Sequence, residues 1–409
     1  MNEPSKKILF LKHHFYIMIN ADITFKNTLS QLTNHYFKVN KQIGSKDRKV
    51  LSELVFTYFR FKFILNNQQI CPQDKIFENI FHYSIKVLNK SDTFQYILQE
   101  WLIYSNNLDI DFNSINDIFN NFSRNFDLIP TLYRNEFSKL DFKTLNIIFS
   151  KSPITIRPAY QNQKHENFIQ TLISNNFDFE FLEKTNSFDI NTFNSFEQVF
   201  KQNNLLYEVQ DNGSILISKY LALLEKQTIL DACAGSGGKS LSIKYFNPKV
   251  EIDLFDTNTY RLNEFNNRNN NFSGLRLLTQ LDIKKKYDIV LIDAPCTGSG
   301  TIRRNPDKLY TINEDIVSEY NILQKQILEI YSNYVNEGGL IIYVTCSLFE
   351  KENIEVVNYF LENNSSFVGD EITNNNILDN SLKITNFAYQ LIPNNYNGDI
   401  FFISQLRKC

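Results

Sequence analysis

The sequence predicts an α/β protein whose C-terminal half forms a doubly wound parallel sheet, behind an all-helical domain and a small α+β domain. Strand-like and helix-like segments alternate from about residue 215 onward, whereas the first 130 residues show mainly helical periodicity. The stretch between them mixes short strands with short helices. At 409 residues the chain is long enough for two or three domains. We therefore place the domains at residues 1–130, 131–215 and 216–409.

The first domain is predicted to be a helical bundle. Phe25, Leu29, Leu32 and Tyr36 recur at the spacing of one helix face. Residues 45–65 predict a helix that is apolar on more than one face and therefore central. The apolar run at 8–20 contains charged and polar residues and is too short to span a bilayer, so we expect a helix or strand and no membrane association. The sequence is consistent with either Met1 or Met18 as the initiating methionine.

Composition and charge narrow the function classes. The chain has a net charge of −3, but its first fifty residues carry nine Lys/Arg against three acidic residues. This basic end fits either a phosphate-binding surface or a solvated face. The five cysteines are widely spaced and contain no CxxC pair, which disfavours both a disulfide framework and a zinc site. We expect a reduced, cytoplasmic protein without a metal.

The remaining elements are predicted in chain order. The small domain should contain strands at 152–159 and 177–184, helices at 165–176 and 195–203, and an extended segment at 205–213. The large sheet should contain strands at 228–233, 250–256, 275–282, 287–293 and 338–347, closed by tail strands at 383–392 and 400–406. A regular apolar stripe predicts a helix between the last two parallel strands, carried by Ile316, Tyr320, Leu323, Ile327, Ile330 and Tyr334.

Ligands of open parallel sheets bind at the carboxyl ends of the strands, so the residues there indicate function. The first strand ends in a glycine-rich turn that opens a helix, which suits a closely approaching ligand. Asp256 follows the second strand at the distance expected for a carboxylate that binds ribose hydroxyls, and Asp282 follows the third. The turn lacks the spacing of NAD-binding and P-loop motifs. S-adenosylmethionine is the common nucleoside cofactor that remains.

Two cysteines follow the fourth and fifth strands. Cys296 lies in "DAPC", close to Asp293, and Cys346 lies in "TCS". Thiols at two adjacent strand ends favour a reactive pair over inert packing, because a helix N-terminus and a cationic cofactor would stabilise a thiolate. A thiolate that adds to C6 of a pyrimidine makes C5 nucleophilic enough to accept a methyl group. Either cysteine could attack on this evidence.

Four motifs in this order resemble the RsmB/Nop/Sun family of RNA cytosine-5 methyltransferases: "LDACAGSGGKS", "FDTN", "IDAPCTGSGTIRRNPD" and "GGLIIYVTCSLFEKEN". The chain is most similar to the bacterial 16S ribosomal RNA branch, in which a NusB-like helical domain precedes the catalytic domain. The resemblance implies a Rossmann-like class I methyltransferase fold, an RRM-like small domain and an RNA-binding role for residues 1–130.

The resemblance also implies residue roles. Cys346 would be the nucleophile, Cys296 would assist release of the product, and Asp293 would bind the cytosine ring. Arg303 and Arg304 would contact RNA phosphate. S-adenosylmethionine or the base would be bound by Cys233, Ala234, Gly235, Ser236, Gly237, Gly238, Lys239, Asp256, Asp282 and Asp293. The turn departs from the family pattern, "CAAPGGKT", by having Gly235 and Ser236 in place of Ala and Pro, which puts cofactor affinity in doubt.

The predicted function is therefore S-adenosylmethionine-dependent methylation of cytosine C5, with 16S ribosomal RNA or a small-subunit precursor as partner and a monomer as the expected state. Two alternatives remain: a DNA cytosine-5 methyltransferase that attacks with Cys296, and a non-catalytic ribosome assembly factor. The sequence does not indicate which cytosine is modified, because base choice depends on RNA shape.

Overall fold

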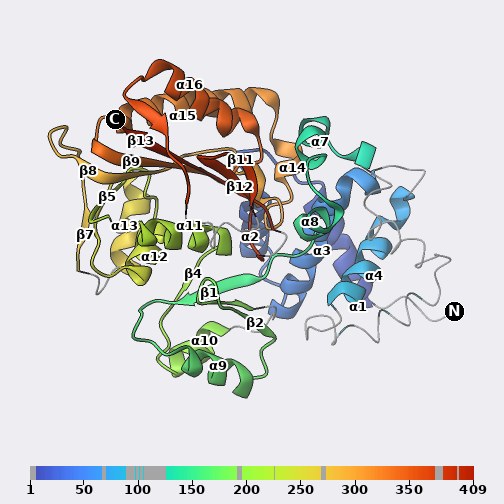
Figure 1. Ribbon diagram of the computed structural model, residues 1–409. Coiled ribbons are helices and arrows are strands. Elements are labelled where there is room, and N and C mark those ends of the chain that lie inside the picture. The colour runs from blue at the N-terminus through green and yellow to red at the C-terminus, as the bar shows by residue number, and fades with distance from the viewer. Residues whose placement is uncertain are drawn as a thin grey trace. The chain divides into compact units, whose positions relative to one another are not determined.

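The computed structural model describes residues 6–66, 71–88, 97, 101, 105, 126–190, 196–224, 226–268, 273–373, 381–393 and 396–409 (Figure 1). The chain forms two compact units. Unit 1 holds the described residues up to Lys151 together with Ile302–Asn313, and unit 2 holds the rest of the described chain.

Unit 1 is helical, as its periodicity predicts. Its elements are α1 (Lys6–Ile19), α2 (Leu29–Val39), α3 (Ser45–Leu65), a short turn η1 (Gln73–Lys75), α4 (Ile76–Leu88), α7 (Thr131–Phe137), α8 (Phe142–Ile148) and α14 (Lys308–Thr311). Helix α3 is buried on several faces and contacts α1, α2 and α4. The apolar run at 8–20 is thus a helix, and Phe25 lies before the start of α2. Most of residues 89–125 lie outside the described residues.

The unit boundaries differ from the predicted domain boundaries at two places. Helices α7 and α8 belong to unit 1, where the ring of Phe149 lies 5.7 Å from those of Phe63 and Phe137. Segment 302–313, which interrupts the predicted catalytic domain, also belongs to unit 1. Aromatic and hydrogen-bonding partners far away in sequence decide both assignments, and local periodicity does not reveal them.

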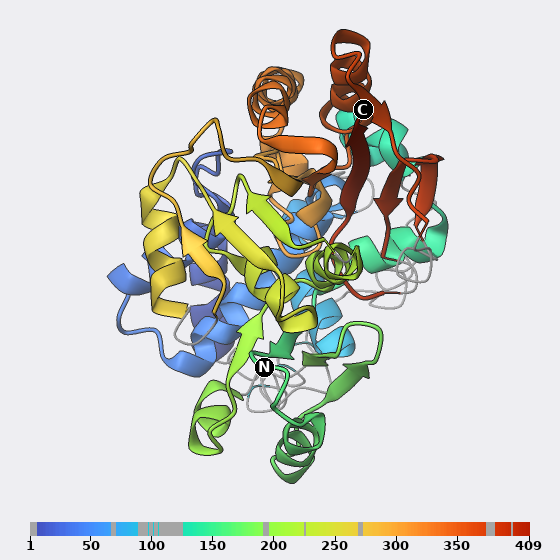
Figure 2. The ribbon, with the colours of Figure 1, turned by 60° about the vertical axis from the view of Figure 1, so that its left-hand side comes forward.

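The first part of unit 2 is a small sheet with two helices. Strands β1 (Ile154–Pro158), β2 (Phe179–Leu182), β3 (Ser187–Ile190) and β4 (Tyr207–Val209) pair in the order β2-β3-β1-β4, with every pair antiparallel. Helices α9 (His165–Ser174) and α10 (Phe196–Gln202) cover one face (Figure 2). A cluster of buried aromatic and aliphatic side chains joins them, including Ile156, Phe168, Phe188 and Phe200.

The second part of unit 2 is a nine-stranded sheet. Its strands are β5 (Thr228–Asp231), β6 (Glu251–Leu254), β7 (Leu275–Leu277), β8 (Tyr287–Asp293), β9 (Val335–Thr345), β10 (Phe367–Gly369), β11 (Leu382–Thr385), β12 (Ala388–Leu391) and β13 (Phe401–Lys408). The order is β11-β12-β13-β9-β8-β5-β6-β7, and β10 pairs with β13. Strands β5 to β9 are parallel to their neighbours, whereas β13 runs antiparallel to β9. The predicted parallel sheet is confirmed. The tail strand predicted at 383–392 is instead a hairpin of two antiparallel strands, β11 and β12, whereas the one predicted at 400–406 corresponds to β13.

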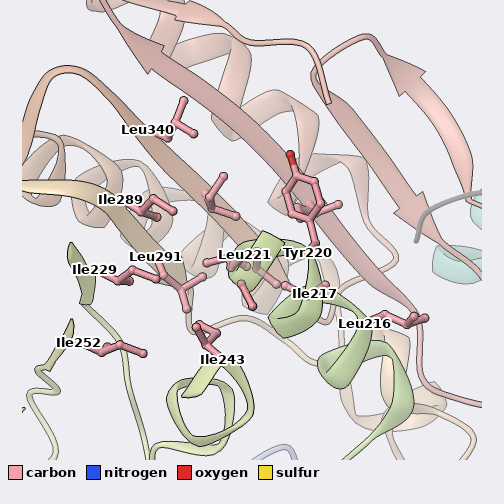
Figure 3. Close-up of a cluster of buried hydrophobic side chains, with 14 of the residues drawn as sticks. Leu216, Ile217, Tyr220, Leu221, Ile229, Ile243, Ile252, Ile289, Leu291 and Leu340 are labelled. Atoms are coloured by element: carbon pink, nitrogen blue, oxygen red, sulfur yellow. The ribbon is translucent and has the colours of Figure 1, made fainter. Parts of the chain in front are cut away.

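Helices cover both faces of this sheet. They are α11 (Asn212–Leu223), α12 (Gly238–Phe246), α13 (Thr259–Arg268), α15 (Glu314–Ser332) and α16 (Ile354–Asn363), with short turns η3 (Ser299–Thr301) and η4 (Glu350–Glu352) in the loops. Alternate strand residues point to opposite faces. Ile229 and Ile289 meet α11 and α12 (Figure 3), whereas Leu230 and Val290 pack with side chains of α15 and α16. This double burial fixes the strand register and brings the carboxyl ends of β5, β6, β8 and β9 to one edge.

Candidate active site

A cleft of about 890 Å³ opens at the carboxyl edge of the large sheet, entirely within unit 2. Ten of the predicted site residues line it: Cys233, Ala234, Gly235, Ser236, Gly238, Lys239, Asp256, Asp293, Cys296 and Cys346. They come from the ends of β5, β6, β8 and β9. The prediction that strand ends bring these side chains together is therefore supported by the geometry.

The glycine turn after β5 forms the floor of this cleft. Gly235 and Gly237 have φ angles of +55° and +76°, which only glycine adopts without strain. A Cβ at Gly237 would lie 2.2 Å from the ring of Phe265, so this glycine packs inward and does not line the cleft. A Cβ at Gly235 or Gly238 would meet nothing within 4 Å. These two positions leave room for a ligand to approach the backbone.

Asp256 holds the turn in place. Its Oδ2 accepts a hydrogen bond of 2.8 Å from the Gly235 amide, and its Oδ1 accepts one of 2.7 Å from the Asn258 amide. The carboxylate thus joins the end of β6 to the turn after β5 while it faces the cleft. Gly235 and Ser236 stand where the family pattern has Ala and Pro, and the hydrogen bond from the Gly235 amide to Asp256 is still formed.

Asp231, the last residue of β5, is a cleft residue that the sequence prediction missed. It is 1% exposed, and its Oδ2 accepts a 2.6 Å hydrogen bond from the Ser240 hydroxyl. Its Oδ1 has no hydrogen-bond partner among the described residues. Burial raises the pKa of Asp231 to about 7, and the nearby charge of Asp293 adds to the rise. A buried strand end looks like core in the sequence, so no local signal distinguished it.

Lys239 and Asp293 form an ion pair in the cleft, with Nζ 2.6 Å from Oδ2. Lys239 is nearly buried, whereas the Asp293 side chain is 34% exposed. Burial lowers the pKa of Lys239, but the charge and hydrogen bond of Asp293 more than offset this effect, and the net pKa is raised. The ion pair holds the Asp293 carboxylate, which stays partly exposed and lines the cleft.

Cys296 and Cys346 meet beside this ion pair. Their Sγ atoms lie 3.4 Å apart, as a hydrogen-bonded pair of free thiols. The hydrogen bond to Cys346, followed by burial, raises the pKa of Cys296 well above its usual value. Cys296 therefore keeps its proton at neutral pH. Burial likewise raises the pKa of the Cys233 thiol, which argues against a reactive role for that residue.

Besides Gly237, three predicted residues do not line the cleft. Strand β7 ends at Leu277, so Asp282 does not stand at a strand end; it is exposed in a turn, where its Oδ1 accepts from the Lys284 amide. Arg303 belongs to unit 1, is 6% exposed and donates to the carbonyl of Lys151. Arg304 is exposed in the same segment. The burial of Arg303 does not fit contact with RNA phosphate.

Helix α15 contributes a wall that sequence reasoning treated as packing only. Tyr320, Leu323, Ile327, Ile330 and Tyr331 line the cleft. Leu323 and Ile330 are 40% and 56% exposed. The core-facing residues of α15 are instead Val317, Asn321, Gln324 and Leu328, so the predicted apolar stripe lies mainly on the cleft side and periodicity alone did not identify the buried face.

No described helix has the length and apolar character to cross a membrane. The part of the chain that the structure describes also contains no group of three or more His, Cys, Asp or Glu side chains arranged to hold a metal ion.

Comparison with known proteins gives consistent matches. Residues 218–407 match the family model described as 16S rRNA methyltransferase RsmB/F. A probable ribosomal RNA small subunit methyltransferase B from Bacillus subtilis is 30% identical over 215 residues, which cover 49% of this chain and 47% of the relative. The matched part of the chain thus spans about half the length of such curated relatives.

Solved structures match over a larger share of the chain. The crystal structure of PH0851 has a TM-score of 0.66 at 18% identity and covers 93% of this chain and 94% of its own. NSun6 from Pyrococcus horikoshii, solved with SFG, has a TM-score of 0.56 at 16% identity and covers 68% of this chain and 97% of its own. At these identities the structural matches establish the fold.

Proposed function

We propose that this protein, whose residues 218–407 match the RsmB/F methyltransferase family model, transfers a methyl group from S-adenosylmethionine to carbon 5 of a cytosine in RNA. The observation that carries the proposal is the pair of thiols 3.4 Å apart beside the Lys239–Asp293 ion pair. A methyltransferase that acts on a nucleophilic nitrogen or oxygen would need neither thiol.

The residues of the cleft fit S-adenosylmethionine. The open space over Gly235 and Gly238 admits the cofactor against the backbone, and Asp256 offers a carboxylate to its ribose. The unpartnered Oδ1 of Asp231 offers a buried acceptor to a cationic group. When bound, this cofactor supplies an electrophilic methyl group. The exposed apolar side chains of α15 give the adenine ring a surface to pack on.

The proposed chemistry begins with loss of the Cys346 proton to solvent, after which the thiolate sulfur bonds to C6 of the cytosine and moves electron density to C5. Asp293 forms a hydrogen bond with the cytosine ring, and Lys239 holds that carboxylate in position. After C5 has gained the methyl group, a base removes the C5 proton and the C6–S bond breaks. The protonated thiol of Cys296, 3.4 Å from Cys346, is placed to assist this release.

The substrate is proposed to be 16S ribosomal RNA or a small-subunit precursor, bound by a monomer in the cytoplasm. The names of the relatives support an RNA of the small ribosomal subunit. Arg304, which is exposed, is the better placed of the two predicted phosphate-binding arginines. A NusB-like role for the helices of unit 1 in RNA binding and an RRM-like role for the small sheet are part of the same proposal.

Two alternatives make different demands on the cysteines. A DNA cytosine-5 methyltransferase would attack with Cys296 and would leave Cys346, 3.4 Å away, without a role. An assembly factor without activity would need neither the ion pair nor the thiol pair.

One experiment separates the three. The wild type, Cys346→Ala and Cys296→Ala are incubated with labelled S-adenosylmethionine and either unmodified small-subunit RNA or duplex DNA. We expect Cys346→Ala to form no covalent RNA complex and to transfer no methyl group, and Cys296→Ala to accumulate that complex. The reverse pattern would assign the attack to Cys296, and inactivity of the wild type on both substrates would favour the assembly factor.

A further inference from the structure

Glu352 is a fully buried carboxylate that the proposed chemistry does not use. It lies in η4, just after the Cys346 loop, and is 0% exposed. Its Oε1 accepts from the Thr297 amide at 2.8 Å and from Gln324 Nε2 at 3.0 Å. Its Oε2 accepts from the hydroxyls of Thr297 and Ser347. Two acceptor sites on each oxygen are thus filled, which is about the full capacity of a carboxylate.

The donors identify what this carboxylate connects. Thr297 directly follows Cys296, and Ser347 directly follows Cys346. Gln324 also donates to the carbonyl of Pro295, which directly precedes Cys296. Glu352 therefore joins the loop after β8, the loop after β9 and helix α15 at one point.

Further hydrogen bonds join the same two loops. The Gly300 amide donates to the carbonyl of Cys346 at 2.9 Å, and the hydroxyls of Ser299 and Ser347 lie 3.0 Å apart. The Leu348 amide donates to the Ser299 hydroxyl at 2.8 Å. Both cysteines are thus held by neighbours that belong to one continuous network, and the side chain of Glu352 accepts four of its hydrogen bonds.

Burying a carboxylate carries a desolvation cost, so the need to hold two loops together does not by itself explain its presence. Within the described residues its donors are all neutral groups, so no cation offsets the cost of removing the charge from water. Apolar side chains of similar volume would hold the loops together without that cost. Hydrogen bonds differ from apolar contacts in fixing direction and distance, so position is what this carboxylate supplies.

We infer that Glu352 is a positioning residue that sets the separation of the Cys296 and Cys346 thiols, through Thr297 on one side and Ser347 on the other. This inference rests on the proposed function for its purpose, which is to let one thiol attack a base while the other stays within reach for release. The positioning itself is a property of the folded protein without substrate.

The first test measures thiol separation without catalysis. The full chain is treated with diamide, which takes two protons and two electrons from the thiol pair, and the rate of Cys296–Cys346 disulfide formation is followed by mass spectrometry. We expect Glu352→Ala to slow this rate about tenfold, the factor that corresponds to about one net hydrogen bond of lost preorganisation. Glu355→Ala, at an exposed acid of the following helix, is the matched control and should react as the wild type.

The Glu352→Gln variant tests whether the hydrogen bonds of this side chain, and not its charge, set the separation of the two thiols. The retained carbonyl oxygen can accept from the Thr297 amide and Gln324, and the two hydroxyls can rotate to accept from the new amide group. We expect this variant to stay near the wild-type rate. An unchanged or faster rate in Glu352→Ala, or an equal loss in both variants, would overturn the inference.

The second test examines the Thr297 side and the Ser347 side of the network separately. It uses no Glu352 variant, so it does not depend on the stability of one. Thr297→Val removes the hydroxyl on the Cys296 side, and Ser347→Ala removes the one on the Cys346 side. We expect Thr297→Val to accumulate covalent RNA complex and Ser347→Ala to form it more slowly, both with lower kcat and an unchanged KM for S-adenosylmethionine. A parallel loss in both variants with a raised KM would indicate general loosening and overturn positioning. If wild type forms no covalent complex, the proposed function fails, whereas the diamide result still decides the inference.

Discussion

Replacing Asp231 by Asn should remove a pH dependence from the stability of unit 2. The carboxyl has a pKa of about 7 in the fold against 3.8 in the unfolded chain, chiefly because it is buried. The folded protein therefore binds a proton that the unfolded chain has lost between these values. The resulting stabilisation is fully present below pH 3.8 and disappears as pH rises through 7.

The magnitude follows from the two pKa values. At about 1.4 kcal/mol for each pH unit, the interval from 3.8 to about 7 corresponds to at most about 4 kcal/mol of unfolding free energy. Asn keeps an oxygen that can accept from Ser240 and carries no titratable proton. Relative to wild type, Asp231→Asn should therefore gain stability steadily from pH 4 to pH 7 and show little further change above it.

Urea unfolding followed by far-UV circular dichroism at several pH values between 4 and 8 measures this difference. Asp307, whose pKa is also raised by burial, is present in both proteins and cancels. S-adenosylmethionine should reduce the difference at pH 8, because its cationic group favours the ionised carboxylate. Parallel pH profiles for the two proteins would refute the assignment of a raised pKa to Asp231.

Two further predictions use matched pairs of residues. Gly237→Ala places a methyl group 2.2 Å from Phe265 at a positive φ and should destabilise unit 2 by about 2–3 kcal/mol. Gly238→Ala meets no neighbour within 4 Å, so its melting temperature should stay near that of wild type. It should instead weaken S-adenosylmethionine binding, as measured by calorimetry. Arg303→Ala should lower the melting temperature of unit 1 because Arg303 is buried, whereas Arg304→Ala should mainly weaken RNA binding and reduce its salt dependence in filter-binding assays. Loss of RNA binding in Arg303→Ala without loss of stability would contradict the burial argument.

The sequence predicted the large sheet well because each strand carries its own signal. A strand buried on both faces is apolar in its buried part, as residues 289–292 of β8 and residues 340–344 of β9 show. The parallel pairing of these two strands, with Asp293 opposite Val344, then brings Cys296 and Cys346 together although fifty residues separate them. The resemblance to a methyltransferase family was confirmed over residues 218–407.

The prediction failed where position depends on partners from elsewhere in the chain. Asp282 was placed at a strand end because apolar residues continue after Leu277, but β7 is an edge strand and its ladder stops early. The family resemblance implied that Arg303 contacts RNA phosphate, yet Arg303 is buried in unit 1 and donates to the carbonyl of Lys151. The strand that pairs with β7 and the carbonyl that binds Arg303 both lie far away in the sequence, so no local pattern predicts either outcome.

Glu352 shows the same limit at the site itself. It lies in "FEKEN", where three charged residues in a row predict the solvated start of a helix, and Glu350 is indeed exposed. Glu352 differs from it only because the turn η4 directs its side chain toward Thr297 and Ser347, which lie on two different loops. Sequence reasoning finds the candidate reactive thiols, since cysteines are rare in this chain. The groups that place them consist of common residues, and only the folded arrangement distinguishes a buried Glu with four neutral donors from its exposed neighbours.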